Sequence, residues 1–222
     1  MSMLHLLAAL MPKVAAPSLT WTFVGSCQST DTALDFSALS AGTIQANDVA
    51  LFIDYAGDLD PPTAVTPSGF TNIVNTSGEN EPGARAMASW KKLAGSEASV
   101  AGMSAGGGFS KLGLVFRPSI DFTTLTVSTP QNSGVTSANP AAITVDPSAE
   151  TIPVVLIGIG AVYMGTVAFS TASPAFDAQI AISDNDMRVG YKIYNSSPLS
   201  HSIDINDLGS ANWLAGFYFE AV

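Results

Sequence analysis

One serine lies in the pattern that many hydrolases use for their nucleophile. Gly102-Met103-Ser104-Ala105-Gly106 matches G-x-S-x-G, and an acid (Asp121 or Asp146) and then His201 follow in the order that such enzymes require. A nucleophile elbow also needs a helix directly after the serine, and Ala105-Gly106-Gly107-Gly108 is a very poor start for one. We therefore interpret Ser104 as a loop residue and predict that this protein is not an enzyme.

Residues that bind metals or cofactors are sparse. His5 and His201 are far apart, and the single cysteine, Cys27, is interpreted as a small buried hydrophobic residue, so no transition-metal site is expected. Acidic clusters at 54–60, 184–186 and 204–207 could supply oxygen ligands to calcium, but the same residue types form tight turns. None has the twelve-residue calcium loop that ends in glutamate. We predict turns there, no metal and no cofactor, and we recognise no phosphate loop, dinucleotide fingerprint or pair of carboxylates.

Aromatic side chains could instead form a carbohydrate-binding platform. The available residues are Trp21, Trp90, Trp213, Tyr191, Tyr194 and Tyr218. Trp90 and Tyr191 lie inside strand patterns and Trp213 begins an apolar run, so core packing is the favoured interpretation. A carbohydrate- or receptor-binding module is the alternative function, and an exposed row of aromatic residues on one sheet face would favour it.

Charge and hydropathy exclude several classes of protein. The chain of 222 residues carries 8 Lys and Arg against 18 Asp and Glu, a net charge of −10, and its one basic pair is Lys91-Lys92. Nucleic-acid binding needs clustered cations, so it is not expected. With 47% hydrophobic residues the chain is not disordered. Its longest apolar run, 154–164, is too short for a membrane span, which needs about 20 residues.

Short apolar runs separated by turn residues predict β-strands. These strands would hold the candidate functional residues in place. In the first half they are 20–24, 48–54, 70–74, 86–93 and 111–118, and in the second half 125–127, 154–157, 187–192 and 213–219. Within 86–93 the side chains alternate, with Met87 on one face and Trp90 on the other. His201 also lies in an alternating stretch.

The second half repeats the first at an offset of about a hundred residues. Phe70 corresponds to Phe176, and Trp90 to Tyr191. This near-constant shift predicts an internal duplication of residues 20–118 and 119–222. The fold class that follows is an all-β, jelly-roll-like β-sandwich over residues 19–222, built from two similar halves with 129–146 as the linker. Two tandem sandwiches are the alternative.

Residues 48 to 118 contain a characteristic series of motifs. The series is the strand Asp48-Val49-Ala50-Leu51-Phe52-Ile53, the turn Pro67-Ser68-Gly69-Phe70, the strand from Arg85 to Trp90-Lys91, the turn Gly95-Ser96-Glu97, and Phe116-Arg117-Pro118. It resembles a module of tailed-phage and gene-transfer-agent virion proteins, although the second half fits less well. The resemblance implies a structural component of a phage virion, such as a head decoration, spike or tail-associated protein. Its partners would be capsid or tail subunits and copies of itself, with a host glycan or receptor as a further partner.

The first eighteen residues differ from the rest of the chain. Leu4, Leu7, Leu10 and Met11 follow helical spacing, and Pro12 ends the pattern. The apolar run is similar to the core of a signal peptide, but no Lys or Arg precedes it. We predict a short helical arm over residues 1–18 that buries these four side chains against another chain. The alternative is that the arm folds back onto its own domain.

Overall fold

The computed structural model describes residues 18–30, 33–57, 65–77, 84–97, 99–101, 109–136, 138–163, 165–182, 186–206 and 210–222. Every regular element within these ranges is a β-strand, which confirms the all-β prediction. Residues 1–17 lie outside the described residues, and with them the predicted helical arm. Among the described residues no helix is long and apolar enough to cross a membrane.

The first half of the chain forms a five-stranded antiparallel sheet in the order β1-β7-β3-β5-β4. Its strands are β1 (Trp21–Ser29), β3 (Ala46–Gly57), β4 (Thr71–Ser77), β5 (Ala84–Ala94) and β7 (Phe109–Pro118). A small sheet of β2 (Ala33–Asp35) and β6 (Ser99–Ala101) lies beside it. The predicted alternation along β5 is confirmed, because Ala88 and Met87 belong to separate apolar clusters on opposite faces.

The second half forms a six-stranded sheet in the order β13-β14-β11-β16-β8, in which β9 also pairs with β16. Its strands are β8 (Leu125–Val127), β9 (Gln131–Thr136), β11 (Val154–Tyr163), β13 (Ala178–Ala181), β14 (Met187–Tyr194) and β16 (Ser210–Ala221). A three-stranded sheet contains β10 (Ile143–Val145), β15 (His201–Asn206) and β12 (Ala168–Ser173).

The interpretation of residues 129–146 as a linker was wrong. This segment contains β9 and β10, and β9 extends along β16. Val135 of β9 is buried in the main core, while the side-chain oxygen of Asn132 accepts a hydrogen bond from the Trp213 indole N–H at 2.7 Å. Polar residues typical of a linker therefore occur here at a sheet edge, where their side chains have hydrogen-bond partners.

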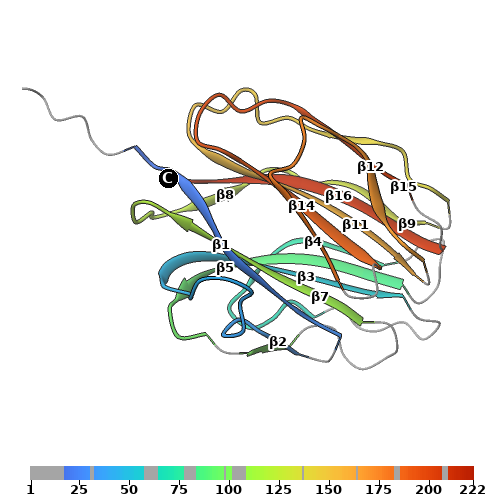
Figure 1. Ribbon diagram of the computed structural model, residues 1–222, viewed down its shortest axis with the longest axis horizontal. Coiled ribbons are helices and arrows are strands. Elements are labelled where there is room, and N and C mark those ends of the chain that lie inside the picture. Colours follow the sequence, from blue (N-terminus) through green and yellow to red (C-terminus); the bar gives the residue numbers. More distant parts are fainter. Residues whose placement is uncertain are drawn as a thin grey trace, which may run out of the picture.

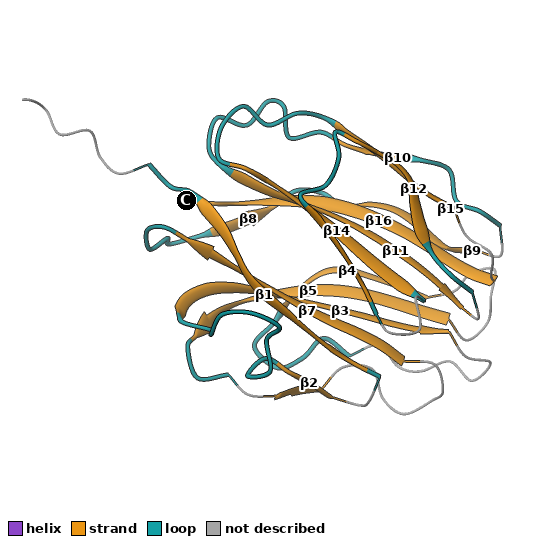
Figure 2. Cartoon of the chain, in the orientation of Figure 1, coloured by secondary structure: helices purple, strands orange, loops and turns teal. Residues whose placement is uncertain are grey.

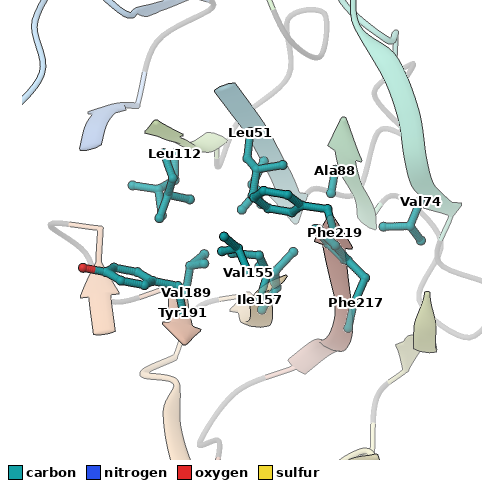
Figure 3. Packing of buried hydrophobic residues seen from close by; sticks show 14 of the residues in the cluster. Leu51, Val74, Ala88, Leu112, Val155, Ile157, Val189, Tyr191, Phe217 and Phe219 are labelled. Atoms are coloured by element: carbon teal, nitrogen blue, oxygen red, sulfur yellow. The ribbon is translucent and has the colours of Figure 1, made fainter. Parts of the chain in front are cut away.

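The two large sheets face each other, with a small sheet on the outside of each (Figures 1 and 2). The main core lies between the large sheets, where Leu51, Ala88 and Leu112 meet Val155, Ile157 and Phe219 (Figure 3). Two smaller apolar clusters lie under the outer sheets. Because the central strands are covered on both faces, they have continuous apolar runs rather than alternation.

The two large sheets have corresponding strand orders. β8 and β9 both pair with β16, as β1 pairs with β7, so together they are the counterpart of β1. The order β1-β7-β3-β5-β4 then corresponds to β8/β9-β16-β11-β14-β13. Phe52 of β3 lies opposite Ser89 and Gly113, and Gly158 of β11 lies opposite Gly190 and Gly216. In the same registers Trp90 lies opposite Leu51, and Tyr191 opposite Ile157. That the two halves arose by duplication stays a prediction, and so does the jelly-roll character of the sandwich.

Polar contacts join the two large sheets at both ends. At one end the Trp21 backbone N–H donates to Oδ1 of Asn195 at 2.7 Å, and the Trp21 indole N–H donates to the Pro153 carbonyl at 3.1 Å. At the other end the buried Tyr55 hydroxyl donates to the Ala211 carbonyl at 2.6 Å. These directional hydrogen bonds fix the position of one sheet relative to the other. Apolar packing alone would not do so, because it is non-directional.

Candidate functional site

The described chain begins at one end of the sandwich, and hydrogen bonds fix it there. The Ser119 N–H donates to the Thr20 carbonyl at 2.8 Å, and the Thr20 N–H donates to Oγ of Ser119 at 2.9 Å. Oγ of Ser119 also lies 3.4 Å from the Ser18 carbonyl. Val222 is held at the same end by Thr124 (Figure 1). We call this the arm end, because residues 1–17 are attached there.

An ion pair between the partly exposed Arg117 and the buried Asp48 lies beside this attachment point. Nε and Nη2 of Arg117 donate to the two carboxylate oxygens of Asp48 at 2.7 and 2.8 Å, and Nη2 also donates to the Thr43 carbonyl. Asp48 is fully buried and accepts a further bond from the Gln45 N–H. The Asp48 carboxylate raises the pKa of Arg117. This bidentate contact fixes the orientation of the guanidinium plane.

Arg117 and Asp48 line a cavity of about 380 Å³. Its other lining residues are Thr22, Gln45, Ala46, Asn47, Pro118, Ser119, Ile120 and Asp121. Asn47 adopts a left-handed backbone conformation with φ of 72°, which non-glycine residues rarely do. Carboxylate, amide, guanidinium and hydroxyl groups can hydrogen-bond a polar ligand here, and Ile120 contributes an exposed apolar surface.

The charges around this cavity are paired with one another. Lys92 lies 2.8 Å from Asp121, donates to the Phe122 carbonyl at 2.6 Å, and lies over the Phe122 ring. The contact with Lys92 lowers the pKa of Asp121. Because both cations have a carboxylate partner, the cavity offers hydrogen-bonding groups without a net charge.

The turn Gly95-Ser96-Glu97 is built around one carboxylate. Glu97 accepts hydrogen bonds from the N–H groups of Ala94, Gly95 and Ser96 at 2.8 to 3.1 Å, and Lys91 lies 3.3 Å away. Burial opposes the charge of Glu97, but these bonds outweigh it and lower its pKa. This explains why the turn needs a glutamate, and gives it a structural role.

At the corresponding place in the second half, the charges are different. Glu220 of β16 lies opposite Val154 in the position that Arg117 has in β7. Burial and the neighbouring Glu150 raise its pKa. The Tyr218 hydroxyl donates to Oε1 of Glu150 at 2.6 Å, and burial together with this carboxylate raises the pKa of Tyr218 to about 12. No sequence pattern reveals this pair of carboxyl groups, because 70 residues separate Glu150 from Glu220.

The predicted site residues have different outcomes. Leu4, Leu7, Leu10 and Met11 lie outside the described residues, as does Ser104. Cys27 is buried, and burial raises the pKa of its thiol to about 12, as expected for a small apolar residue. Trp21, Trp213, Tyr191 and Tyr194 are buried, and Trp90 packs against the main core, so the structure confirms that these aromatic residues serve packing.

The acidic clusters lie only partly within the described residues. Asp54 is fully buried and faces Lys111 at 3.7 Å, whereas residues 58–60, 184, 185 and 207 lie outside the described ranges. In the part of the chain that the structure describes, no group of three His, Cys, Asp or Glu side chains could hold a metal ion. His201 is buried on β15 and contacts Tyr194, which confirms its predicted place in a strand.

Comparison with known proteins found no match: no family model fits the sequence, and no curated protein or solved structure matches the chain.

Proposed function

We propose that this protein is a structural component of a phage virion, a head decoration, spike or tail-associated protein. It would dock through its N-terminal arm, by Leu4, Leu7, Leu10 and Met11, onto capsid or tail subunits or other copies of itself. The observation that carries the proposal is the attachment of this apolar segment to a fixed point, the bonds between Thr20 and Ser119, at one end of the sandwich. Four buried side chains of this kind contribute about 6–12 kcal/mol of gross transfer free energy.

The motifs that resemble virion proteins support a structural role. The turn at 67–70 closes with a bond from the Phe70 N–H to the Pro67 carbonyl, and Gly69 there has φ of 78°. Glu97 organises its own turn, and Arg117 joins β7 to the start of β3. These contacts give the motifs a structural role, and the proposal includes no catalytic activity.

Deletion of residues 1–17 tests the proposal. We expect the truncated chain to remain folded, because the sandwich core lies within residues 19–222. We also expect it to be absent from virus particles purified from cells that express it. Incorporation is measured by quantitative mass spectrometry of particles purified from cells that express either form.

A matched control replaces Leu4 and Leu7 by aspartate in the full-length chain. It keeps the length of the arm and removes part of its apolar surface, so we expect the same loss of incorporation. Normal incorporation of both variants would show that docking does not use the arm. Absence of the unmodified chain from particles would contradict the virion assignment itself.

We further propose that the two halves arose by duplication of one unit. The corresponding strand orders and the correspondence of Trp90 with Tyr191 support it. So does the reciprocal contact between halves, in which β1 contacts β14 while its counterpart β9 contacts β5, the counterpart of β14. Such reciprocity is typical of a symmetric dimer. The common ancestor would then be a single-sheet protein that buried one face against a second copy.

One observation favours a second candidate, a carbohydrate- or receptor-binding module. The cavity at the arm end presents Gln45, Asn47 and Arg117 together, and planar polar side chains of this kind can pair with sugar hydroxyl groups. Glycan-array binding of the truncated chain tests it. Binding that is lost in Asn47→Ala and retained in a remote variant, Ser133→Ala, would support this candidate, and no binding to any glycan would remove it.

A further inference from the structure

His201 lies between the outer three-stranded sheet and the six-stranded sheet. On β15 the buried side chains alternate, so that His201, Ile203 and Ile205 face the six-stranded sheet. The imidazole stacks on Phe176 with ring centroids 6.0 Å apart and planes at 24°. Its Nε2 atom lies 2.5 Å from the Tyr194 hydroxyl oxygen. The ring is therefore part of the contact that holds the outer sheet in place.

The hydrogen bonds around this ring fit its neutral form. The Tyr194 hydroxyl accepts a bond from the Leu199 backbone N–H, which leaves its own hydrogen to donate to Nε2. The ring proton then lies on Nδ1, and this buried atom has no hydrogen-bond partner among the described residues. A protonated ring would have two N–H donors, whereas the residues that the structure describes around it provide one acceptor, the Tyr194 oxygen. Protonation in this place is therefore strongly unfavourable.

The charged groups near His201 do not compensate for this. Lys192 of β14 and Asp177, which precedes β13, lie 2.5 Å apart and largely neutralise each other. Asp146 follows Val145, the β10 partner of His201, and its carboxylate accepts the Ser148 N–H. Burial and then the charge of Lys192 lower the pKa of His201 to about 4.

Other titratable groups lie on the outer sheet itself and on the six-stranded sheet beneath it. Asp204 of β15 is on the opposite face from His201, because side chains alternate along the strand. Glu220 and Tyr218 of β16 contact Glu150. The pKa of Glu220 is raised, so its protonation favours the folded form on acidification, which is opposite in sign to the effect of His201.

The outer sheet can separate without breaking either main sheet. Its strands β10, β15 and β12 form their own hydrogen-bonded sheet, distinct from the six-stranded one. They are held by an apolar cluster that includes Val145, Ile203 and Ile205, which is separate from the main core. Glycines form part of the surface beneath, where Gly158 and Gly216 contact Ile203 and Gly160 contacts Ile205. Local opening of such a unit exposes far less apolar surface than global unfolding does.

We propose that the outer sheet of β10, β15 and β12 is an acid-sensitive cover, which detaches when His201 is protonated and uncovers the glycine-lined face of the six-stranded sheet. In the open form the imidazole regains its ordinary pKa of 6.5, against about 4 in the closed form. The open form therefore takes up the proton first, and opening is favoured as the pH falls from 6.5 toward 4. The opening constant rises about 30-fold between pH 8 and pH 5.

Hydrogen exchange of the full-length chain tests this proposal, with rates corrected for the intrinsic effect of pH. We expect amides of β15 to open about 30-fold more often at pH 5 than at pH 8, while amides of β11 keep their protection. In His201→Leu, β15 should show the same protection at both pH values. In Tyr194→Phe, which retains the histidine, the dependence on pH should persist.

Two results would overturn the proposal. One is equal loss of protection in β15 and β11, which would indicate global unfolding, and the other is a dependence on pH that survives in His201→Leu. If His201→Leu does not fold, an NMR titration of the two histidine rings in the unmodified chain decides the matter. One ring must then titrate near pH 4, and titration of both near 6.5 contradicts the proposal.

Discussion

The two halves use one sheet arrangement with opposite chemistry at a corresponding position. In the first half Arg117 of β7 pairs with the buried Asp48 of β3. In the second half Glu220 of β16 lies opposite Val154, and its neighbour is a second carboxyl group, Glu150. The charges at this position have opposite signs in the two halves, and Glu220 has a carboxyl neighbour where Arg117 has a counter-ion, although β7 and β16 occupy corresponding places in their sheets.

The outer faces of the sheets differ far more than the inner faces. Toward the main core both halves place large apolar residues, such as Leu114 in β7 and Phe217 in β16. On the outer faces Phe52 packs its ring against Phe70, whereas Gly158 leaves room for Phe176 to lie on the sheet. Shared inner packing maintains the sandwich, and each outer face is free to acquire its own cover and its own chemistry.

Loss of the first-half ion pair should have the largest effect. Arg117→Met leaves the buried Asp48 without its counter-ion, so we expect the free energy of unfolding at pH 7 to fall by about 3 kcal/mol in denaturant titration. Arg117→Lys keeps the charge but loses the bidentate contact, so the free energy of unfolding should fall by an intermediate amount. Glu220→Met at the corresponding position should not destabilise the protein comparably. Equal losses at the two positions would remove the contrast between the halves.

The sequence predicted the inner strands and missed most of the outer ones. The runs that became β3, β7, β11 and β16 are strongly apolar because both of their faces are buried, and this signal is local. The covering strands β2, β6 and β10 have three residues each in turn-rich segments, too short for any periodicity to be recognised. β9 was missed because its Asn and Ser residues, whose side chains bond to β16, are also typical of linkers.

The polar contacts were less predictable still. Asp48 with Arg117, and Glu150 with Glu220, join residues about 70 positions apart, and no spacing rule relates such pairs because only the strand register brings them together. Glu97 was the exception. Its backbone partners lie within three residues along the chain, so the motif Gly95-Ser96-Glu97 could be recognised as a turn before its geometry was known.

The glycine surface should give the next largest effect. A Cβ atom at Gly190 would lie 2.3 Å from the Phe176 ring, so Gly190→Ala should destabilise the protein by about 2 kcal/mol in thermal unfolding. The corresponding residue of the first half, Ser89, already has a side chain, and Ser89→Ala should have almost no effect. Adding Phe176→Leu should recover part of the loss in Gly190→Ala. A Gly190→Ala protein as stable as the original would show that Phe176 does not lie against this glycine.

The carboxyl pair should give a smaller effect that depends on pH. The folded form raises the pKa of Glu220, so its charge is unfavourable above that pKa and the penalty disappears as the pH falls. Glu220→Gln should therefore stabilise the protein by about 0.5 kcal/mol at pH 7 and have no effect in acid. Glu97→Gln is the matched control of opposite sign. The folded form lowers the pKa of Glu97, so the charged carboxylate stabilises the protein above pH 4.5, and this stability is lost as the pH falls. Denaturation at several pH values distinguishes the two, and parallel profiles would contradict this account.

Because the two large sheets share one arrangement and one register, an ion pair from one half should also form in the other. The direct measurement is a double-mutant cycle of Val154→Asp and Glu220→Arg, in a Glu150→Gln background that removes the competing carboxylate. If positions 154 and 220 reproduce the geometry of Asp48 and Arg117, the cycle should give a favourable coupling of about 2 kcal/mol in the free energy of unfolding. A coupling of zero would show that the two halves do not place these positions alike.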